Sequence, residues 1–483
     1  MKTISIQQVK SKLKSENCWF EEPHTIPAIF TELNPRPYLD LLFPLITDRS
    51  VNRAIVMMGP RRVGKTVMIH HAIKKLIDGG TDPEQICYVS IDHPIYNSLN
   101  LDDFLELYME ITEIDYRTNE VYFFFDEIQY LKDWERYLKT IVDRYPYAKC
   151  IVSGSAAAAL RLKSSESGAG RFTDFLLPPL TFYEYLYLLN KLELVEISED
   201  KGEIELEFKA KDIEELNLNF IDYVNYGGYP EVIFSETIQS DPARFIKNDI
   251  IDKVLLRDLP GLYGIQDIQE LNYLFTTLAY NTANEISLNE ISQGSGIAKN
   301  TIGRYIDYLE AAFLVRKLHR IDRNAKRFKR ANFFKIYLTN PSIRTALFSP
   351  ATPDDENWGS LVETAIFAQW FHSEGLLNYA RWNNGEVDIV DLDTRDQSVR
   401  WAVEVKWSNR FFYRPEELKS LISFCHAQNL NEPLVTTISE QGFKMFKNVS
   451  IEYRPASLYC FELGYNIITG KLKSEPDTHR FQK

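Results

Sequence analysis

The eight residues GPRRVGKT, from Gly59 to Thr66, constrain the fold of this chain more than any other stretch. They satisfy the pattern G-x-x-x-x-G-K-[S/T]. They stand between the apolar run RAIVMM and the segment VMIHHAIKKLI, whose apolar residues recur at helical spacing. A strand, a glycine-rich loop and a helix in this order direct backbone N–H groups and a helix N-terminus at an anion. The pattern therefore predicts a phosphate-binding loop; the alternative is an incidental glycine turn.

Each residue type in this loop suits a nucleoside triphosphate. Lys65 would neutralise the β- and γ-phosphates, and the Thr66 hydroxyl would ligate Mg²⁺. ATP and Mg²⁺ are therefore the expected ligands. The residues expected to contact the nucleotide are Gly59, Pro60, Arg61, Arg62, Val63, Gly64, Lys65 and Thr66.

The run VYFFFDEIQ supplies two carboxylates at the end of another apolar strand, residues 121–125. Asp126 would hold Mg²⁺ through water, and Glu127 would polarise the attacking water. The later run IVSGS offers Ser153 or Ser155 as a polar sensor beside the γ-phosphate. Without the loop, the two carboxylates would read as an ordinary solvated strand end.

Further apolar runs extend this pattern into a domain. ICYVSID and AKCIVSGS read as strands, and LDDFLELYMEI and WERYLKTIVDRY read as helices. Strands this apolar are buried on both faces, as in a parallel sheet covered by helices. An α/β domain is therefore expected over residues 45–180 or so.

These stretches resemble a widespread prokaryotic group of AAA-type ATPases that is allied to archaeal ATPases. The resemblance covers residues from about 25 to 235 and rests on five segments in order: GPRRVGKT, FFFDEIQ, the SGS strand end, ESGAGRFTDFLLPPLTFYEYL and YGGYPEV. It implies ATP hydrolysis, with Lys65, Thr66, Asp126 and Glu127 in the roles given above.

The same resemblance makes Arg171, in the GAGR segment, a candidate γ-phosphate sensor or arginine finger. A surface ion pair is the alternative for this side chain. The resemblance also implies a homo-oligomer, because an arginine from a neighbouring subunit can complete the nucleotide site in this group.

Residues 287–315, SLNEISQGSGIAKNTIGRYIDYLEAAFLV, have the layout of a helix–turn–helix. Leu288 and Ile291 are expected to face the core from the first helix, and residues 294–296 to form the turn. The second helix is expected to bury Ile302, Tyr305, Ile306 and Leu309 and to present Lys299, Asn300, Thr301 and Arg304. This winged-helix layout suits the major groove of DNA but also serves as a protein-contact module, so both roles stay open.

The segment RKLHRIDRNAKRFKR, residues 316–330, carries eight Lys or Arg against one Asp. In a chain of net charge −13 it is a local electropositive segment that suits a phosphate backbone. Its alternative is a solvated charged loop. The acidic average neither indicates nor excludes a nucleic-acid partner.

Two strand-like runs near the C-terminal end bring charged residues together. In GEVDIV, Glu386 and Asp388 share one face, and in AVEVKW, Glu404 and Lys406 share one. If these strands are neighbours, Asp388, Glu404 and Lys406 converge. Two such carboxylates favour Mg²⁺, and the lysine can orient a water or balance the charge on a phosphate. A cross-strand ion pair is the alternative.

This order of residues resembles the PD-(D/E)xK nuclease core, in which Glu363 on the preceding helix completes a metal site with Asp388 and Glu404. The resemblance implies catalytic roles for Asp388, Glu404 and Lys406. A degenerate nuclease fold stabilised by an ion pair is the alternative.

From about residue 250 onward, the chain also resembles a domain of uncharacterised function that is commonly attached to these ATPases. The marks are KIYLTNP, LVETAIF, GEVDIV and AVEVKW. That domain usually carries Asp-Pro after its first strand, where this chain has Asn340-Pro341. The difference weakens any ligand role for position 340.

The length of 483 residues leads us to expect about three domains. We predict an AAA-type α/β ATPase domain with its lead-in over 1–180, a helical lid over 181–260, a winged-helix-like module over 261–325 and a PD-(D/E)xK-like α/β domain over 326–483. The five cysteines form no CxxC pair, and no signal peptide or run of about 18 apolar residues is found. A cytoplasmic chain without structural zinc or membrane partner is expected.

The expected function is ATP binding and hydrolysis coupled to a Mg²⁺-dependent nuclease or a DNA-binding C-terminal domain. The alternative is a regulatory ATPase switch whose C-terminal domain binds DNA or protein without cleavage. The sequence does not distinguish DNA from RNA.

Overall fold

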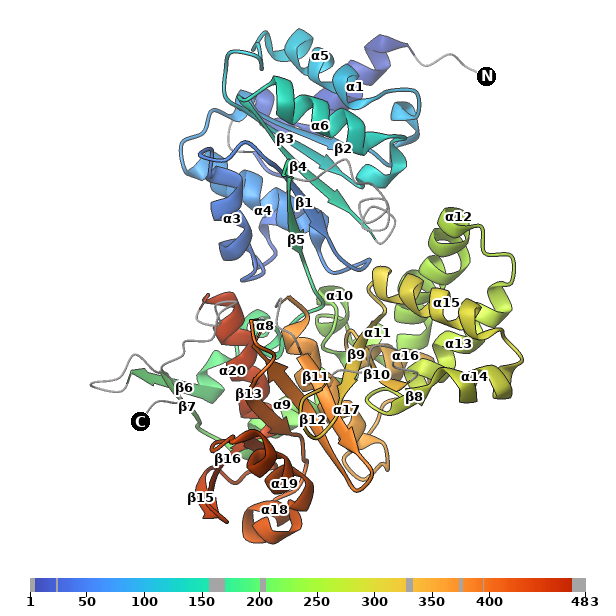
Figure 1. Ribbon diagram of the computed structural model, residues 1–483. Coiled ribbons are helices and arrows are strands. Elements are labelled where there is room, and N and C mark those ends of the chain that lie inside the picture. The colour runs from blue at the N-terminus through green and yellow to red at the C-terminus, as the bar shows by residue number, and fades with distance from the viewer. Residues whose placement is uncertain are drawn as a thin grey trace. The chain divides into compact units, whose positions relative to one another are not determined.

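The computed structural model consists of two compact units, Met1–Leu177 and Pro178–Lys483 (Figure 1). It describes residues 5–22, 25–155, 170–199, 206–326, 333–372, 377–393 and 395–470. The first unit ends next to the predicted boundary at 180. The three segments predicted beyond that boundary lie together in the second unit.

The first unit is built on a sheet of five strands in the order β2-β3-β4-β1-β5. All neighbouring strands are parallel, as the apolar runs predicted. Because β4 lies between β1 and β3, the strand before the phosphate loop and the strand that ends in Asp126 are not neighbours. The strands are β1 (Ala54–Met58), β2 (Ile86–Ser90), β3 (Val121–Asp126), β4 (Ala148–Gly154) and β5 (Phe172–Leu176).

Helices cover both faces of this sheet (Figure 1). On one face, α1, α5 and α6 share an apolar core with Phe123, Phe125 and Val152, and each buried phenylalanine contributes about 1.5–3 kcal/mol. On the other face lie α3 and α4. The helices are α1 (Ile6–Glu16), α2 (Ala28–Thr31), α3 (Leu39–Thr47), α4 (Lys65–Asp78), α5 (Leu101–Thr112) and α6 (Trp134–Arg144).

The segment between β1 and α4 depends on glycine at two positions. Gly64 has a φ of 93°, in the left-handed region where other residues are strained. At Gly59, an added Cβ would lie 2.2 Å from the backbone oxygen of Leu177, so no larger residue fits. Helix α4 begins at Lys65, directly after this loop.

The second unit contains a mixed sheet of nine strands in the order β15-β16-β14-β13-β12-β11-β9-β10-β8. The pairs β9–β11, β13–β14 and β14–β16 are parallel and the others antiparallel, so the sheet is mixed. The strands are β8 (Glu285–Ser287), β9 (Val315–Ile321), β10 (Phe333–Leu338), β11 (Leu377–Trp382), β12 (Gly385–Leu392), β13 (Val399–Glu404), β14 (Leu434–Thr437), β15 (Gly442–Phe446) and β16 (Val449–Pro455).

The remaining elements of this unit are mostly helical. The acidic stretch after α8 forms an antiparallel pair, β6 (Val195–Glu199) and β7 (Leu206–Ala210). The segments Ala243–Ile251 and Val254–Asp258 are π-helical. The α-helices are α8 (Phe182–Leu188), α9 (Ile213–Tyr226), α10 (Pro230–Ile233), α11 (Glu236–Ser240), α12 (Leu259–Tyr263), α13 (Ile268–Tyr280), α14 (Leu288–Ser295), α15 (Lys299–Ala311), α16 (Ser342–Leu347), α17 (Trp358–Gln369), α18 (Arg410–Tyr413), α19 (Lys419–Gln428) and α20 (Ala456–Ile468).

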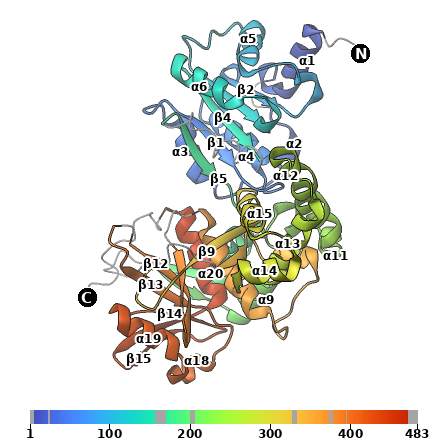
Figure 2. The same ribbon diagram turned by 45° about the vertical axis from the view of Figure 1, so that its right-hand side comes forward.

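One stretch of the second unit runs α13–β8–α14–α15–β9–β10, with the three helices gathered together (Figures 1 and 2). The predicted core residues of α15, Ile302, Tyr305, Ile306 and Leu309, are buried. By contrast, Leu288 and Ile291 are only half-buried, so α14 contributes less to the core than predicted. Strands β8, β9 and β10 belong to the nine-stranded sheet, so this stretch shares its sheet with the C-terminal region.

A β-bulge in β12 sets the orientation of Asp388. Val387 pairs with Ala380 but Val390 pairs with Asn378, so β12 has one extra residue between them. Val387 and Val390 therefore both join the apolar core under α19, and Asp388 is turned away from it. Of the helices in the described ranges, none combines the length and the apolar character needed to cross a bilayer.

Candidate functional site

The phosphate loop, residues 59–66, folds around its own lysine. Lys65 Nζ donates to the backbone oxygens of Gly59 at 3.0 Å and Pro60 at 2.8 Å, and its side chain is buried. From the lead-in segment, Arg36 Nη1 donates to Val63 O at 2.7 Å and holds the loop from behind. A bound triphosphate would offer Lys65 charged oxygens in exchange for neutral carbonyls, which strengthens its hydrogen bonds.

Asp126, at the end of β3, lies in contact with the first turn of α4. Its Oδ2 accepts hydrogen bonds from Thr66 Oγ1 at 2.6 Å and from Tyr88 OH at 3.2 Å, and its Oδ1 accepts one from Ser153 Oγ. Asp126 is only 2% exposed, so these hydroxyls replace the water that a buried carboxylate loses. Burial, and next the charge of Asp126, raise the pKa of Tyr88 well above its ordinary value, which keeps its hydroxyl a donor.

The contact between Thr66 and Asp126 decides whether the site suits a magnesium ion. Mg²⁺ prefers hard oxygen ligands and keeps several waters alongside one or two carboxylates. A hydroxyl and a carboxylate stand side by side at the loop, 2.6 Å apart. The residues present therefore fit the predicted ion, with Thr66 as a direct ligand and Asp126 acting through water.

Glu127 follows in an unusual backbone conformation. Its φ of 57° and ψ of 46° are left-handed, which costs a non-glycine residue on the order of 1–3 kcal/mol. Two contacts hold it there: its N–H donates to Ser153 Oγ at 3.2 Å, and its carboxylate accepts from Gln129 Nε2. The strained turn separates Glu127 from the strand and leaves its side chain half-buried beside Asp126.

The two candidate sensor serines differ in their contacts. Ser153 Oγ lies between Asp126 and the Glu127 backbone, where it fixes both. Ser155 Oγ is buried and has no hydrogen-bond partner among the described residues, and Ser155 N donates to Gln129 Oε1 at 3.3 Å. Ser155 is therefore the serine with a hydroxyl available for a further contact.

Arg171 stands apart from this site within its own chain. It directly precedes β5, its backbone oxygen accepts from Ala54 N at the start of β1, and its Nε lies 2.9 Å from Asp143 Oδ1. Because β1 and β5 are parallel, this is the amino edge of the sheet, opposite the edge that carries the phosphate loop. The contact with Asp143 is the surface ion pair given as the alternative, and the role of Arg171 as a sensor or finger stays a prediction.

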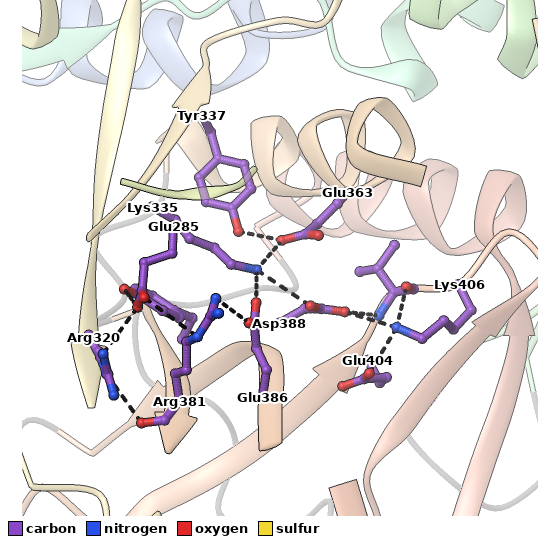
Figure 3. Close-up of polar contacts among 12 residues, drawn as sticks. Glu285, Arg320, Lys335, Tyr337, Glu363, Arg381, Glu386, Asp388, Glu404 and Lys406 are labelled. Atoms are coloured by element: carbon purple, nitrogen blue, oxygen red, sulfur yellow. Dashed lines mark hydrogen bonds and ion pairs between the residues drawn. The ribbon is translucent and has the colours of Figure 1, made fainter. Parts of the chain in front are cut away.

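The second predicted cluster forms at the junction of β12 and β13, which are antiparallel neighbours as expected (Figure 3). Lys406 Nζ lies 2.8 Å from Glu404 Oε1 and 3.5 Å from Asp388 Oδ2. The N–H of Val405 donates to Asp388 Oδ2 at 2.9 Å. Asp388, Glu404 and Lys406 thus converge, although β13 ends at Glu404.

A residue that the sequence reasoning missed, Lys335 on β10, occupies the centre of this cluster (Figure 3). Its Nζ lies 2.7 Å from Glu386 Oε1, 2.9 Å from Glu363 Oε1 and 3.4 Å from Asp388 Oδ1. Tyr337 lies two residues further along the same strand, and its OH donates to Glu363 Oε1 at 2.6 Å. A signal was present in the sequence: FFKIYL places a lysine inside an otherwise apolar strand, with Tyr337 on the same face.

Further ion pairs extend the cluster toward β8 and β9. Arg381 Nη1 donates to Glu386 Oε2 at 2.8 Å, and its Nε lies 3.5 Å from Glu285 Oε1. Glu285 also accepts from Tyr379 OH at 2.6 Å and pairs with Arg320 at 3.4 Å. Five carboxylates thus meet four cations in one connected network.

Burial and the neighbouring charges shift the pKa values of these groups in opposite directions. Burial raises the pKa of Glu363 and of Glu404 to about 7, in each case against the attraction of a lysine. Burial alone would raise the pKa of Asp388, but the charges of Lys406 and Lys335 outweigh it and lower that pKa. For Lys335, burial alone would lower the pKa, and the surrounding carboxylates raise it well above its usual range.

The same geometry tests the metal site predicted for Glu363, Asp388 and Glu404. Among the residues that the structure describes, no group of three or more His, Cys, Asp or Glu side chains is arranged to hold a metal ion. Lys335 separates Glu363 from Asp388, and Lys406 bridges Asp388 to Glu404. Ammonium groups thus lie between the carboxylates that were predicted to share an ion, and the metal site stays a prediction.

Two other predicted features have clear positions. Asn340, at the position where Asp-Pro was expected, is fully buried; its Oδ1 accepts from Ser342 N at 2.9 Å and it begins the turn into α16. On α15, Asn300 and Arg304 are exposed, whereas Lys299 and Thr301 are half-buried. The basic segment 316–330 is described only to residue 326, so its last four residues lie outside the described part.

Family comparisons divide the chain in a similar way. Residues 51–186 match the family model of an AAA domain. Residues 217–354 match that of a domain of unknown function. The second match ends before β11 and so does not include Asp388, Glu404 or Lys406.

Relatives and solved structures are distant. An uncharacterized protein of Haemophilus influenzae is 22% identical over 400 residues, 81% of this chain and 91% of the relative. An uncharacterized protein of Methanocaldococcus jannaschii is 24% identical over 408 residues, 81% of this chain and 84% of the relative. The Aeropyrum pernix ORC1 protein in complex with DNA shares 12% identity at a TM-score of 0.32, covering 68% of this chain and 95% of that one. The replication initiator DnaA bound to AMPPCP and single-stranded DNA shares 16% identity at a TM-score of 0.26, covering 56% of this chain and 86% of that one. The chain carries an AAA domain over residues 51–186, and the phosphate loop with the Asp126 strand end lies within it.

Proposed function

We propose that this chain binds ATP at the phosphate loop and hydrolyses it. The observation that carries the proposal is the hydrogen-bonded series Thr66–Asp126–Ser153, which joins α4 to the carboxyl ends of β3 and β4 beside Lys65. Lys65 would bind the β- and γ-phosphates, and Glu127 would hold the attacking water.

A magnesium ion would be held by the Thr66 hydroxyl and, through water, by Asp126. When bound, it neutralises charge on the β- and γ-phosphates. Tyr88 and Ser153 would keep the Asp126 carboxylate in place while the loop opens to admit the nucleotide. Arg171 of a second copy remains a proposed finger for an oligomeric form.

Replacing Lys65 by Ala tests nucleotide binding. The variant is expected to bind a fluorescent ATP analogue about tenfold or more weakly, because one or more charged hydrogen bonds to phosphate are lost. Lys74→Ala is the matched control, since Lys74 lies on the same helix but pairs with Asp78 on an exposed face. Equal affinity in Lys65→Ala and the control would contradict the proposal.

For the second unit we propose binding of nucleic acid without cleavage. Two observations support this role: α15 presents Asn300 and Arg304 in a winged-helix-like order of elements, and Lys335 occupies the centre of the nuclease-like cluster. The convergence of Asp388, Glu404 and Lys406 is what favours the competing reading, a Mg²⁺-dependent nuclease. Protein contact through α15 is the other alternative.

An assay on plasmid, linear DNA, single-stranded DNA and RNA distinguishes these roles. With Mg²⁺ or Mn²⁺, and with or without ATP, we expect salt-sensitive binding and no cutting. Arg304→Ala is expected to weaken binding and reduce the salt slope by about one unit, whereas Arg414→Ala, at an exposed site far along the chain, leaves both unchanged. Metal-dependent cutting that Asp388→Asn abolishes would instead establish the nuclease.

A further inference from the structure

The Lys335 ammonium is surrounded by three carboxylates. An ammonium has three N–H donors and no acceptor. Lys335 Nζ donates to Glu363 Oε1 at 2.9 Å and to Asp388 Oδ1 at 3.4 Å, and it forms an ion pair with Glu386 Oε1 at 2.7 Å. The Lys335 side chain is 2% exposed, so no water competes for these donors. The charge of Lys335 is therefore directed at these carboxylates and not at a phosphate or another ligand in solution.

The spacing around Lys335 suits an ammonium and not a metal ion. Charged N–H···O contacts are about 2.7–2.9 Å long, whereas Mg²⁺ takes its oxygens at about 2.0–2.1 Å. Carboxylates gathered around Nζ stand too far from a common centre to ligate Mg²⁺. An ion can enter only if Lys335 leaves and the carboxylates close in.

Neighbouring groups fix the carboxylates at that wider spacing. Tyr337 OH holds Glu363, Arg381 holds Glu386 and the Val405 N–H holds Asp388, at 2.6, 2.8 and 2.9 Å (Figure 3). Lys335 itself extends from β10, which is paired on both sides, with β8 and β9. The lysine, its three partners and the groups that hold them thus lie on three strands (β10, β11 and β12), on α17 and at Val405 directly after β13, and not in one flexible loop.

We propose that Lys335 is a built-in cation, whose ammonium takes the place of a divalent ion between Glu363 and Asp388, two of the three carboxylates predicted to hold one. The second unit then keeps a nuclease-like fold without its metal. This inference deepens the non-cleaving role proposed for that unit, on which its functional meaning rests. It accounts for a lysine with three carboxylate partners in a position where an apolar residue would fit the strand.

The test is Mn²⁺ binding to the full chain without nucleotide, in a Thr66→Ala background that removes the hydroxyl ligand at the phosphate loop. Binding is followed by electron paramagnetic resonance, and stability by thermal unfolding. For the Thr66→Ala chain without a second substitution, we expect no Mn²⁺-dependent rise in the unfolding temperature. Adding Lys335→Met should lower the unfolding temperature, and Mn²⁺ should restore it with an affinity at least about tenfold higher than that of the Thr66→Ala chain. The reason is that Glu363, Asp388 and Glu386 each lose one cation, while only Asp388 and Glu386 keep another, Lys406 and Arg381.

Two matched variants locate the gained site. Lys406→Met removes the other lysine of the cluster but leaves Lys335 in place, so it should gain no Mn²⁺ affinity. Adding Glu363→Gln to Lys335→Met should abolish the gain. A folded Lys335→Met chain that gains no Mn²⁺ affinity would overturn the proposal.

The chain with Lys335 present decides the question even if Lys335→Met does not fold. Stoichiometric Mn²⁺ binding that Asp388→Asn abolishes would show that an ion already occupies the cluster, which would contradict the proposal. The absence of such binding would support the proposal. Cleavage of nucleic acid by a chain that binds no ion there would remove the non-cleaving role and leave the built-in cation standing.

Discussion

Glu127→Gln is expected to lower the rate of ATP hydrolysis about 100- to 10,000-fold, the usual contribution of a positioned general base. Glutamine has the same shape but cannot accept a proton from the attacking water. Nucleotide binding should persist, because Lys65, Thr66 and Asp126 keep their contacts. Phosphate release measures the first effect, and binding of a fluorescent ATP analogue measures the second.

Glu113→Gln provides the matched control for this experiment. Glu113 is exposed at the end of α5, and its φ of 63° places it in the same left-handed region as Glu127. The control therefore makes the same chemical change on the same kind of backbone, outside the nucleotide site. If Glu127→Gln hydrolyses ATP as fast as Glu113→Gln, Glu127 is not the base.

Gly228→Ala is expected to destabilise the second unit by about 3 kcal/mol or more, a large part of the 5–15 kcal/mol typical of a domain. An added Cβ would lie 2.6 Å from Ser342 Oγ and 2.7 Å from Asn340 Oδ1. Neither side chain can yield freely, since both are fully buried and Asn340 Oδ1 is bonded to Ser342 N. Moving the Gly228 backbone instead strains its hydrogen bond from Leu180 N at 3.0 Å.

Urea unfolding of the full chain, followed by tryptophan fluorescence, measures this loss. Gly359→Ala is the control: Gly359 lies in the first turn of α17, and an added Cβ there meets nothing within 4 Å. It should stabilise slightly, by about 0.5–1 kcal/mol, because alanine favours the helix. Equal urea midpoints for the two variants would contradict the packing argument.

The first unit was predictable from sequence because its signals are local. Each of β1 to β4 is a run of apolar residues buried on both faces, and the phosphate-loop motif predicts the turn into α4. Strand β5 was missed for a physical reason. It pairs only with β1, its residues are mostly half-buried or exposed, and Asp174 interrupts the apolar run.

The second site was predictable only in part. The alternation along GEVDIV and AVEVKW indicated that Asp388, Glu404 and Lys406 share one side, and the structure brings them together. Lys335 belongs to a strand more than 50 residues earlier in the chain, and only the parallel pairing of β9 with β11 brings β10 near β12. Long-range pairing of this kind leaves no mark in local periodicity.

The order of strands in the nine-stranded sheet has a mechanical consequence. Each strand of this sheet is hydrogen-bonded to its neighbour from β8 to β15, with a β-bulge in β12, so α15, which leads into β9, and the Lys335 network are attached to the same sheet. A force on either edge of the sheet is therefore transmitted through its hydrogen-bonded strands to the other edge. Moving the stretch from α13 to β10 into another protein would therefore disrupt the nine-stranded sheet, because β8, β9 and β10 are part of it.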